Sequence, residues 1–241
     1  MQTRTALVTG AAQCLGQEFG VALAGRGCRV AGLDLVPQGE TAGKVLDHLE
    51  LVADATGEEQ VRAALRHVTD AFGTLHGLVD NAGVYPARPF GETTAEDWRR
   101  VMCVNPEAPL LVTRAALPRL RAAGWGRIVD IASAAVFTAP PDMVPYVASK
   151  TGLIGFTRAL AAALGPYGIA VNAIAPSMVR TDTAERTVGA DGGFGLVRSQ
   201  RVVPRTQETA DLVSTLLYVV DEGSGFLTGQ TLNVSGGSAF L

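Results

Sequence analysis

The sequence predicts an α/β fold in which one doubly wound parallel sheet of about seven strands carries helices on both faces. Three observations predict it. Short apolar runs rich in β-branched residues alternate with helical patterns along the chain. A glycine-rich loop follows the first of these runs. The length of 241 residues suits one large α/β domain, and no linker or repeat divides it. We therefore expect one domain over residues 1–241.

The composition limits the classes of function. Hydrophobic residues make up 47% of the chain, charged residues 18%, and the net charge is −3. No basic stripe is present, so nucleic acid is not an expected partner. Cys14, Cys28 and Cys103 lack metal-binding or redox spacing, which predicts reduced thiols and no metal site. We see no signal peptide and no apolar run of membrane-spanning length, so we expect a cytoplasmic protein without a membrane partner.

The first strand, Thr5–Thr9, leads through T-G-A-A-Q-C-L-G into a helix over residues 17–24. A strand, a glycine turn and a helix form the context of a dinucleotide phosphate loop. Gly10 permits the tight turn, and Gly16 lets the start of the helix lie close to the strand and the pyrophosphate. The loop supplies the first candidate cofactor residues: Gly10, Gln13, Cys14, Leu15 and Gly16.

The second strand, C-R-V-A-G-L, ends in Asp34, about 20 residues after the loop. A carboxylate there is placed to accept hydrogen bonds from the adenosine ribose and would repel a 2′-phosphate, so it favours NAD over NADP. An exposed loop aspartate is the less favoured interpretation, because Asp34 terminates an apolar strand. A third strand, Leu49–Val52, brings Asp54 to its end, and an amphipathic helix covers Glu58–Phe72.

The fourth strand, Gly77–Val79, is closed by D-N-A-G, whose small residues let the backbone approach a ligand closely. Asn81, Ala82 and Gly83 are candidate cofactor residues for this reason. A helix over Thr94–Cys103 is expected to have Thr94 as its N-cap. Asn105 and Pro106 fall inside the helical pattern that follows, where the proline predicts a kink.

The rest of the chain continues the alternation. We expect the following elements: a strand at Arg127–Ile131, a helix at Tyr146–Leu164, a strand at Ile169–Ile174, an irregular candidate lid at residues 183–200, a helix at Glu208–Val220 and a strand at Gln230–Val234. The helix at residues 152–164 is apolar almost all round, so either the core or a partner subunit buries it. Residues 101–117 are a second candidate interface.

Ser133, Tyr146 and Lys150 form the most informative group. Ser133 follows the fifth strand, while Tyr146 and Lys150 are spaced i and i+4 and so share one helix face. A phenol titrates at about 10, and a nearby ammonium favours its ionised form. The phenol can then exchange a proton with an alcohol or a carbonyl. None of these side chains carries a hydride, so a cofactor must supply it. Taken alone, Y-x-x-x-K also fits an exposed helix face.

The motifs occur in one recognisable order. T-G-x-x-x-x-x-G at residues 9–16, N-A-G at 81–83, Asn105, Ser133, Y-x-x-x-K and the segment 176–181 together resemble the short-chain dehydrogenase/reductase family over nearly the whole chain. The resemblance implies a Rossmann domain, a homotetramer, Tyr146 as the acid/base and a cofactor-binding residue, and Lys150 lowering its pKa while holding the nicotinamide ribose. It further implies these roles: Ser133 polarises the substrate oxygen, Asn105 supports a water-linked proton path, Asp54 lies near the adenine, and Pro176, Val179 and Thr181 belong to the segment that holds the carboxamide.

Within that family, stretches such as N-A-G-V-Y-P and N-A-I-A-P-S-M-V-R-T look most like NAD-dependent secondary alcohol dehydrogenases, including 1-phenylethanol dehydrogenases. Similarity to 3-oxoacyl-carrier-protein reductases is also broad. The chain departs from the family pattern at four positions: Cys14 where glycine is usual, Asp80 where asparagine is frequent, Ser177 where glycine is usual, and Ser235 where aspartate is frequent.

The leading hypothesis is an NAD(H)-dependent enzyme that interconverts a secondary alcohol and a ketone. A catalytically idle dinucleotide-binding module is one alternative, and a reductase of acyl-carrier-protein thioesters that prefers NADPH is another. The residues expected near the substrate are mostly apolar, which suits an aryl or alkyl ketone: Val84, Tyr85, Ala134, Val136, Met143, Met178 and Phe194.

Overall fold

Helices and strands alternate through the computed structural model, which describes residues 3–188 and 193–240. The strands are β1 (Thr5–Thr9), β2 (Arg29–Asp34), β3 (Leu49–Val52), β4 (Gly77–Asp80), β5 (Gly126–Ile131), β6 (Ile169–Pro176) and β7 (Thr231–Val234). The α-helices are α1 (Cys14–Gly25), α2 (Gly39–Lys44), α3 (Glu58–Phe72), α4 (Ala95–Met102), α5 (Ala108–Ala123), α6 (Ala135–Thr138), α7 (Val144–Leu164), α8 (Asp182–Val188), α9 (Phe194–Ser199) and α10 (Ala210–Val220).

The strands of the described residues form one seven-stranded parallel sheet in the order β3-β2-β1-β4-β5-β6-β7. The order reverses between β1 and β4, the point at which open α/β sheets bind their ligands. Every residue of β1, β5 and β6 is buried, as expected for central strands covered on both faces. The predicted doubly wound fold is confirmed.

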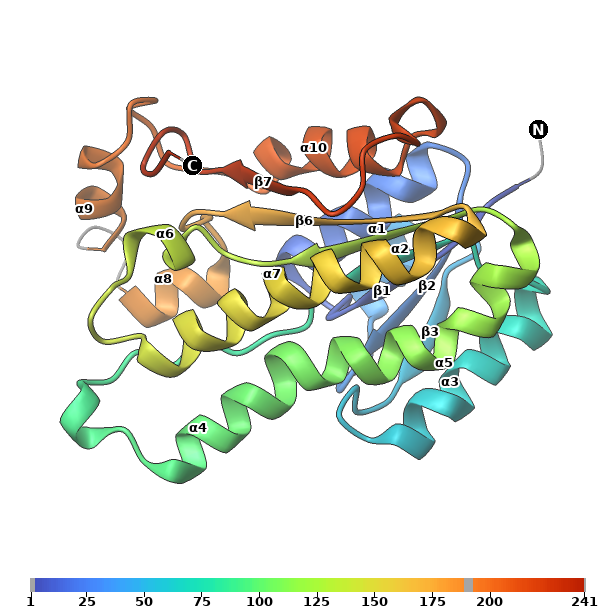
Figure 1. The fold of residues 1–241 in the computed structure, drawn as a ribbon, viewed down its shortest axis with the longest axis horizontal. Helices are drawn as coiled ribbons and strands as arrows, with labels where there is room; N and C mark the ends of the chain where they lie inside the picture. The colour runs from blue at the N-terminus through green and yellow to red at the C-terminus, as the bar shows by residue number, and fades with distance from the viewer. Residues whose placement is uncertain (1–2, 189–192, 241) are drawn as a thin grey trace.

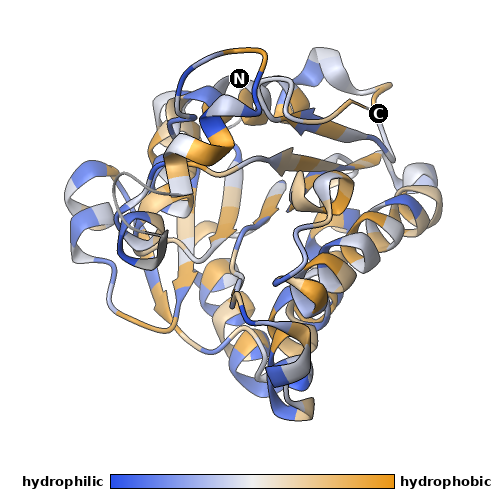
Figure 2. Cartoon of the chain, turned by 90° about the vertical axis from the view of Figure 1, so that its left-hand side faces the viewer, coloured by the Kyte–Doolittle hydropathy of each residue, from blue (hydrophilic) through white to orange (hydrophobic). Residues whose placement is uncertain are grey.

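Two apolar layers hold helices against the sheet. One layer joins the sheet to α3, α5 and α7, and includes Leu65, Val112 and Leu164. The other joins it to α1 and α10 through Phe19 and Leu216. Figure 1 shows the sheet between these two groups of helices, and Figure 2 shows its largely hydrophobic strands in the middle of the molecule. Burial of this apolar area is the main force that stabilises the fold.

Most predicted elements lie within two residues of their observed bounds, and the helix at Glu58–Phe72 matches at both ends. Helix α7 begins at Val144, two residues before the predicted start, because Pro145 fits a first turn that needs no backbone donor. Thr94 caps α4 as predicted, since its Oγ1 accepts a 3.0 Å hydrogen bond from the Asp97 amide. The short helices α2 and α6 were not predicted.

The expectation of an irregular segment at residues 183–200 is wrong over most of its length. Helices α8 and α9 occupy Asp182–Val188 and Phe194–Ser199. Helices of six or seven residues are too short to show a clear helical period among glycines. Residues 189–192 of the predicted lid lie outside the described residues. Helices α6, α8 and α9 gather at the end of the sheet to which β6 and β7 point (Figure 1).

Across the described ranges, no helix combines the length and the apolar character that crossing a membrane requires.

Candidate active site

The loop after β1 closes tightly against its neighbours. Gly10 has φ +66°, a left-handed conformation that glycine adopts without strain, and its amide donates to the Leu33 carbonyl at 2.8 Å. A Cβ added to Gly16 would lie 2.0 Å from the Gly10 carbonyl oxygen. Asn81 Nδ2 donates to the carbonyls of Thr9 and Gly10, at 3.0 and 3.2 Å. The two glycines therefore allow the start of α1 to lie directly on the loop.

Gly16→Ala is expected to distort this loop, because its new Cβ would overlap a backbone atom that cannot rotate away. The matched control is Gly25→Ala at the other end of α1, where an added Cβ meets no atom within 4 Å. We expect Gly16→Ala to lower the free energy of unfolding by about 1–3 kcal/mol and to weaken NADH binding at least tenfold. Urea denaturation and NADH fluorescence titration measure the two effects. Equal behaviour of the two variants would contradict the close packing.

Cys14 has φ +52°, so a residue with a side chain occupies a left-handed position. Such a conformation costs about 1–2 kcal/mol for an ordinary residue, which explains why glycine is favoured there. The Cys14 sulfur lies 3.9 Å from Thr183 Oγ1 of α8. No side chain caps α1 at Gln13. The first amides of the helix therefore suit an anion such as a pyrophosphate.

Asp34 lies at the carboxyl end of β2, as predicted. Its Oδ2 accepts a 2.9 Å hydrogen bond from the Ala12 amide, and its Oδ1 accepts one from Val36 at 3.3 Å. The carboxylate thus holds the glycine loop and still has acceptor sites for a ribose hydroxyl. Asp54 instead organises the turn before α3, accepting hydrogen bonds from the amide and hydroxyl of Thr56 at 2.8 and 2.7 Å. Its place near an adenine stays a prediction.

The corner after β4 joins the glycine loop after β1 to Asn105 and Lys150. The amides of Asn81 and Ala82 both donate to Thr9 Oγ1, at 3.0 and 3.1 Å. A Cβ on Gly83 would lie 3.3 Å from Asn105 Oδ1 and 3.5 Å from Lys150 Nζ. The absence of a side chain at Gly83 lets these two groups come close to the corner.

Asn105 lies in a π turn, Cys103–Glu107, between α4 and α5. Pro106 lacks an amide hydrogen, and the helix widens where this donor is missing. Asn105 Nδ2 donates to the Val84 carbonyl and to Ser149 Oγ, both at 2.9 Å, and Oδ1 accepts from the Val84 amide at 2.9 Å. Ser149 Oγ in turn donates to the Tyr146 carbonyl at 2.7 Å. Asn105 therefore ties the corner after β4 to helix α7.

Ser133, Tyr146 and Lys150 come together where β5 ends and α7 begins. The Ser133 hydroxyl hydrogen-bonds the Tyr146 phenol and also accepts from the Ala135 amide at 3.1 Å. Lys150 Nζ donates to the Ile131 carbonyl at 2.6 Å and lies 6.0 Å from the centre of the Tyr146 ring. Tyr85 meets Tyr146 edge to face, with ring centres 6.4 Å apart. The predicted trio is thus assembled around one phenol.

The pKa of the Tyr146 phenol is set mainly by burial. Burial raises the pKa of Tyr146 above its usual value, and the Ser133 hydrogen bond only partly offsets this rise. No effect of Lys150 on that pKa appears in this structure, where its ammonium donates to the Ile131 carbonyl, so the lowering stays a prediction. Burial also lowers the pKa of Lys150 itself, to about 8.

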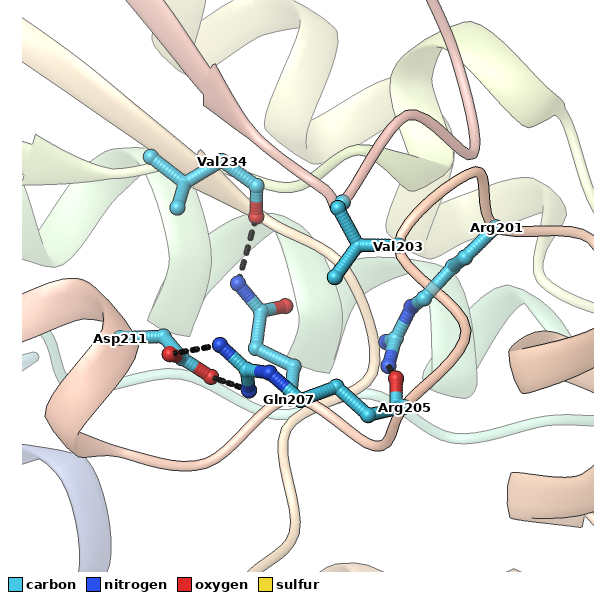
Figure 3. Close-up of a pocket in the computed structure, with 7 residues that line it drawn as sticks. Arg201, Val203, Arg205, Gln207, Asp211 and Val234 are labelled. Carbon is cyan, nitrogen blue, oxygen red and sulfur yellow. Dashed lines mark hydrogen bonds and ion pairs between the residues drawn. The ribbon is translucent and has the colours of Figure 1, made fainter.

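The segment after β6 is held by residues from a pocket that the sequence did not reveal (Figure 3). Arg201 donates to Ser177 Oγ at 3.1 Å and to the Met178 carbonyl at 2.7 Å. Gln207 Oε1 accepts from the Ser177 amide at 3.1 Å, and Val179 forms a β-bridge with Gln207. The pocket has a volume of about 190 Å³ and is lined by Arg201, Val203, Arg205, Gln207, Asp211, Val234 and Gly236.

This pocket contains none of the predicted catalytic residues, and its polar groups bind one another. Arg205 makes two hydrogen bonds to Asp211, both of 2.6 Å, and Gln207 Nε2 donates to the Val234 carbonyl at 2.6 Å (Figure 3). We assign it a structural role in shaping the segment 176–181. Pro176 ends β6 within that segment, and Thr181 Oγ1 accepts from the Ala184 amide at 3.1 Å, which caps α8.

Comparison with known proteins agrees with this geometry. Residues 10–239 match the family described as enoyl-(acyl carrier protein) reductase. The chain is 34% identical to the (2S)-[(R)-hydroxy(phenyl)methyl]succinyl-CoA dehydrogenase subunit BbsD of Thauera aromatica, covering 100% of this chain and 98% of that one. The chain belongs to the short-chain dehydrogenase/reductase family. The recognition made from the motifs is confirmed.

Two further relatives of this short-chain dehydrogenase/reductase carry information about chemistry. The chain is 32% identical to trans-4-hydroxycyclohexanecarboxylate dehydrogenase of Sinomonas cyclohexanicum, over 97% of this chain and 92% of that one. It superposes with a TM-score of 0.91 on the 3-ketoacyl-(acyl-carrier-protein) reductase of Brucella melitensis in complex with NADH, at 27% identity over 98% of both chains. The protein is therefore an oxidoreductase of a family that binds a nicotinamide dinucleotide.

The residues present fit such a cofactor. The uncapped start of α1 suits the pyrophosphate, Asp34 suits a ribose, and Lys150 lies beside the corner at Gly83. The sequence did not single out several groups that shape the site. They include Ser149, which links Asn105 to α7, and Arg201 and Gln207 from the last third of the chain. Contacts between residues far apart in sequence define these roles, so no local motif shows them.

Proposed function

We propose that this short-chain dehydrogenase/reductase uses NAD(H) to interconvert a secondary alcohol and a ketone. The observation that carries the proposal is the partly buried phenol of Tyr146, hydrogen-bonded to Ser133 at the carboxyl end of the sheet, with Lys150 one turn further along α7. A proton donor and a second hydrogen-bonding hydroxyl at one point suit a substrate oxygen.

The mechanism assigns each residue a physical task. When bound, the cofactor supplies or accepts the hydride. In ketone reduction, the Tyr146 phenol gives its proton to the carbonyl oxygen, and in alcohol oxidation the phenolate takes one. Ser133 orients that oxygen through a hydrogen bond. Lys150 provides positive charge beside the phenol, and Asn105 fixes the helix that carries both residues.

The preference for NAD rests on Asp34. A 2′-phosphate would place a second negative group against its carboxylate, which already binds the Ala12 amide. An acyl-carrier-protein reductase is the second candidate, favoured by the description of the matching family and by the Brucella melitensis relative. An enzyme of this kind is expected to present a basic docking surface, which a net charge of −3 does not suggest. The Brucella melitensis relative is a complex with NADH, so the choice of cofactor alone does not separate the two candidates.

A cyclic or aryl ketone is the proposed substrate class. The names of two relatives describe a hydroxyl group on or beside a ring. Tyr85, which is 38% exposed, stands edge to face with Tyr146 and offers an aromatic wall. Val136 is partly buried against an apolar cluster that includes Ile154. Phe194 is 5% exposed and lies 5.9 Å below the Arg180 guanidinium, so we do not assign it to the substrate wall.

Steady-state rates on aryl ketones, cyclic ketones, sugars and acyl thioesters, each with NADH and NADPH, test the proposal. We expect the highest kcat/KM with NADH and a cyclic or aryl ketone. The highest value with an acyl thioester, with either cofactor, would favour the carrier-protein reductase instead. Binding of NADH without turnover of any substrate would support an idle dinucleotide-binding module.

The protein is also proposed to form a homotetramer. Ile154, Ala161 and Leu164 of α7 are buried within the chain, so they need no partner. The opposite side of α7 exposes a stripe of small residues: Gly152, Gly155, Ala159, Ala162 and Ala163. Leu110 of the neighbouring α5 is 44% exposed. An exposed surface of small and apolar residues allows two helices to approach closely.

Light scattering at micromolar concentration is expected to give about four times the mass of one chain. Ala159→Arg, on the exposed stripe, should dissociate the assembly, because it places a bulky charge in a close contact. Arg158 already lies exposed beside it, so Arg158→Lys serves as the control that keeps the local charge. A monomer in the unmodified protein would exclude the tetramer.

A further inference from the structure

Two buried carboxyl groups lie side by side behind the catalytic helix, and the mechanism above does not use them. Asp80 ends β4, Asp130 lies in β5, and the two are register partners in this parallel pair. Neighbouring strands lie about 4.8 Å apart, and side chains at paired positions point to the same face. The two residues are 2% and 0% exposed. The sheet thus places two acids together out of reach of water.

Each carboxyl group has one oxygen with a partner and one without. Thr113 of α5 donates to Asp80 Oδ2 at 3.3 Å, and Thr157 of α7 donates to Asp130 Oδ2 at 2.6 Å. Both Oδ1 atoms are buried and accept no hydrogen bond from any residue that the structure describes. An ionised oxygen without a donor is costly in such a place. A proton on the pair lowers this cost, because a protonated carboxyl is itself a donor.

Lys150 is the charged group that acts on both acids. It is 4% exposed, and its Nζ donates to the carbonyl of Ile131, the residue after Asp130. Burial lowers the pKa of Lys150 to about 8, and Asp130 and then Asp80 oppose this change. The other groups that face the acids are the hydroxyls of Thr113 and Thr157, while Asn105 of the π turn binds Ser149.

The acids themselves titrate far from their usual range. Burial raises the pKa of Asp130 to about 7, against the opposing effects of Thr157 and Lys150. Burial also raises the pKa of Asp80 well above its usual value, and the neighbouring charge of Asp130 adds to this rise. Two adjacent carboxylates cannot both ionise at little cost in a dry site, so one of them retains its proton.

We propose that Asp80 and Asp130 hold one proton between them at neutral pH, and that the single negative charge left on the pair keeps the ammonium of Lys150 charged beside Tyr146. One proton makes the cluster neutral, with one carboxylate and one ammonium. Two ionised acids would bury excess negative charge, and two protonated acids would leave the ammonium without a counter-charge. Asp80 and Asp130 are positioning residues in this scheme, since they act through Lys150.

The effect on turnover rests on the proposed function, whereas the shared proton is measurable without it. The test uses Asp80→Asn, Asp130→Asn and the double variant, all of which keep the shape of the side chain. Asp70→Asn on the exposed side of α3 is the matched control for the loss of one negative charge.

The first measurement is urea unfolding as a function of pH. Both acids have folded pKa values above their unfolded values, so the stability they contribute at low pH is lost as pH rises. We therefore expect the free energy of unfolding of the wild type to fall, relative to the double variant, from about pH 4 through about pH 7. Each single variant should show a smaller fall, and Asp70→Asn should follow the wild type. Parallel curves for the wild type and both single variants would overturn the proposal, even if the double variant fails to fold.

The second measurement is the pH dependence of kcat for ketone reduction. The rate should fall as pH rises and Lys150 loses its proton. Because the pKa of Tyr146 is raised, a fall that begins below about pH 9 reports the titration of Lys150 and not that of the phenol. Each single variant keeps one carboxylate and should retain the wild-type profile. In the double variant, the pH at which kcat falls should be about 1–3 units lower than in the wild type, because Lys150 has lost its counter-charge. An unshifted double variant would overturn the role of the pair. If no variant turns over any ketone, the proposed function fails, and the unfolding measurement still tests the shared proton.

Discussion

Replacing Tyr146 by phenylalanine is expected to lower kcat for ketone reduction by about 10²- to 10⁴-fold, the range that general acid–base catalysis contributes. The ring would still pack edge to face against Tyr85, so the fold should be unchanged. What is lost is the hydroxyl that Ser133 binds and that transfers the proton. Pre-steady-state and steady-state rates with NADH measure the loss in kcat, and thermal unfolding checks that the fold is intact.

A matched control separates proton transfer from a general effect of the substitution. Tyr218→Phe removes the same hydroxyl from a ring on α10 that is 57% exposed, and it should leave kcat unchanged. NADH affinity should remain within about threefold in Tyr146→Phe, since the phosphate loop and Asp34 are untouched. Turnover of Tyr146→Phe at near the wild-type rate would eliminate the proposed acid/base.

The pH dependence of alcohol oxidation follows from the same phenol. The phenolate is the base in this direction, so the rate should rise with pH. Because burial raises the pKa of Tyr146, we expect the rate to rise only at high pH unless another positive charge lies near the phenol. The positive charge that NAD would bring beside Tyr146 when bound would favour the phenolate, as any nearby cation does.

Motifs carried in short stretches of sequence were the most reliable guide to this molecule. The T-G-x-x-x-x-x-G loop depends on Gly10 and Gly16, and the structure shows that a left-handed φ and a 2.0 Å approach require glycine there. The strands were equally clear, because central parallel strands need continuous apolar runs. The Y-x-x-x-K spacing predicts that the side chains of Tyr146 and Lys150 share one helix face, and both residues lie in α7 (Val144–Leu164).

Contacts across the sheet could not be predicted in the same way. Asp80 and Asp130 are fifty residues apart, and only the β4–β5 register brings them together. Asp80 was noticed as a departure from a frequent asparagine, but Asp130 gave no signal. The direction of the Lys150 ammonium also depends on a backbone carbonyl of β5, which the spacing of Tyr146 and Lys150 alone does not predict. Burial raises the pKa of Tyr146 and lowers that of Lys150, and the sequence predicts burial only as a pattern of apolar residues.

The second large expected effect concerns the choice of cofactor. The unmodified protein should prefer NAD to NADP by roughly 100-fold or more in kcat/KM, because like charges in a partly desolvated site cost several kcal/mol and each 1.4 kcal/mol is tenfold. The charge at the end of β2 is Asp34, held in place by the Ala12 amide. Arg29 offers no compensation, since it lies at the other end of β2 and donates to the Phe72 carbonyl at 2.8 Å.

The double variant Asp34→Ala/Gln13→Arg should move the preference toward NADP, because it removes the repulsive carboxylate and adds a cation at the start of α1. Asp34→Ala alone should abolish the preference for NAD over NADP. It should also weaken NAD binding, since the Ala12 amide loses its acceptor. Asp70→Ala, a loss of the same charge on the exposed side of α3, should leave the ratio unchanged. Values of kcat/KM with both cofactors decide the matter. Equal kcat/KM values with the two cofactors in the unmodified protein, or an NAD-to-NADP ratio that Asp34→Ala does not alter, would show that Asp34 does not determine the cofactor preference.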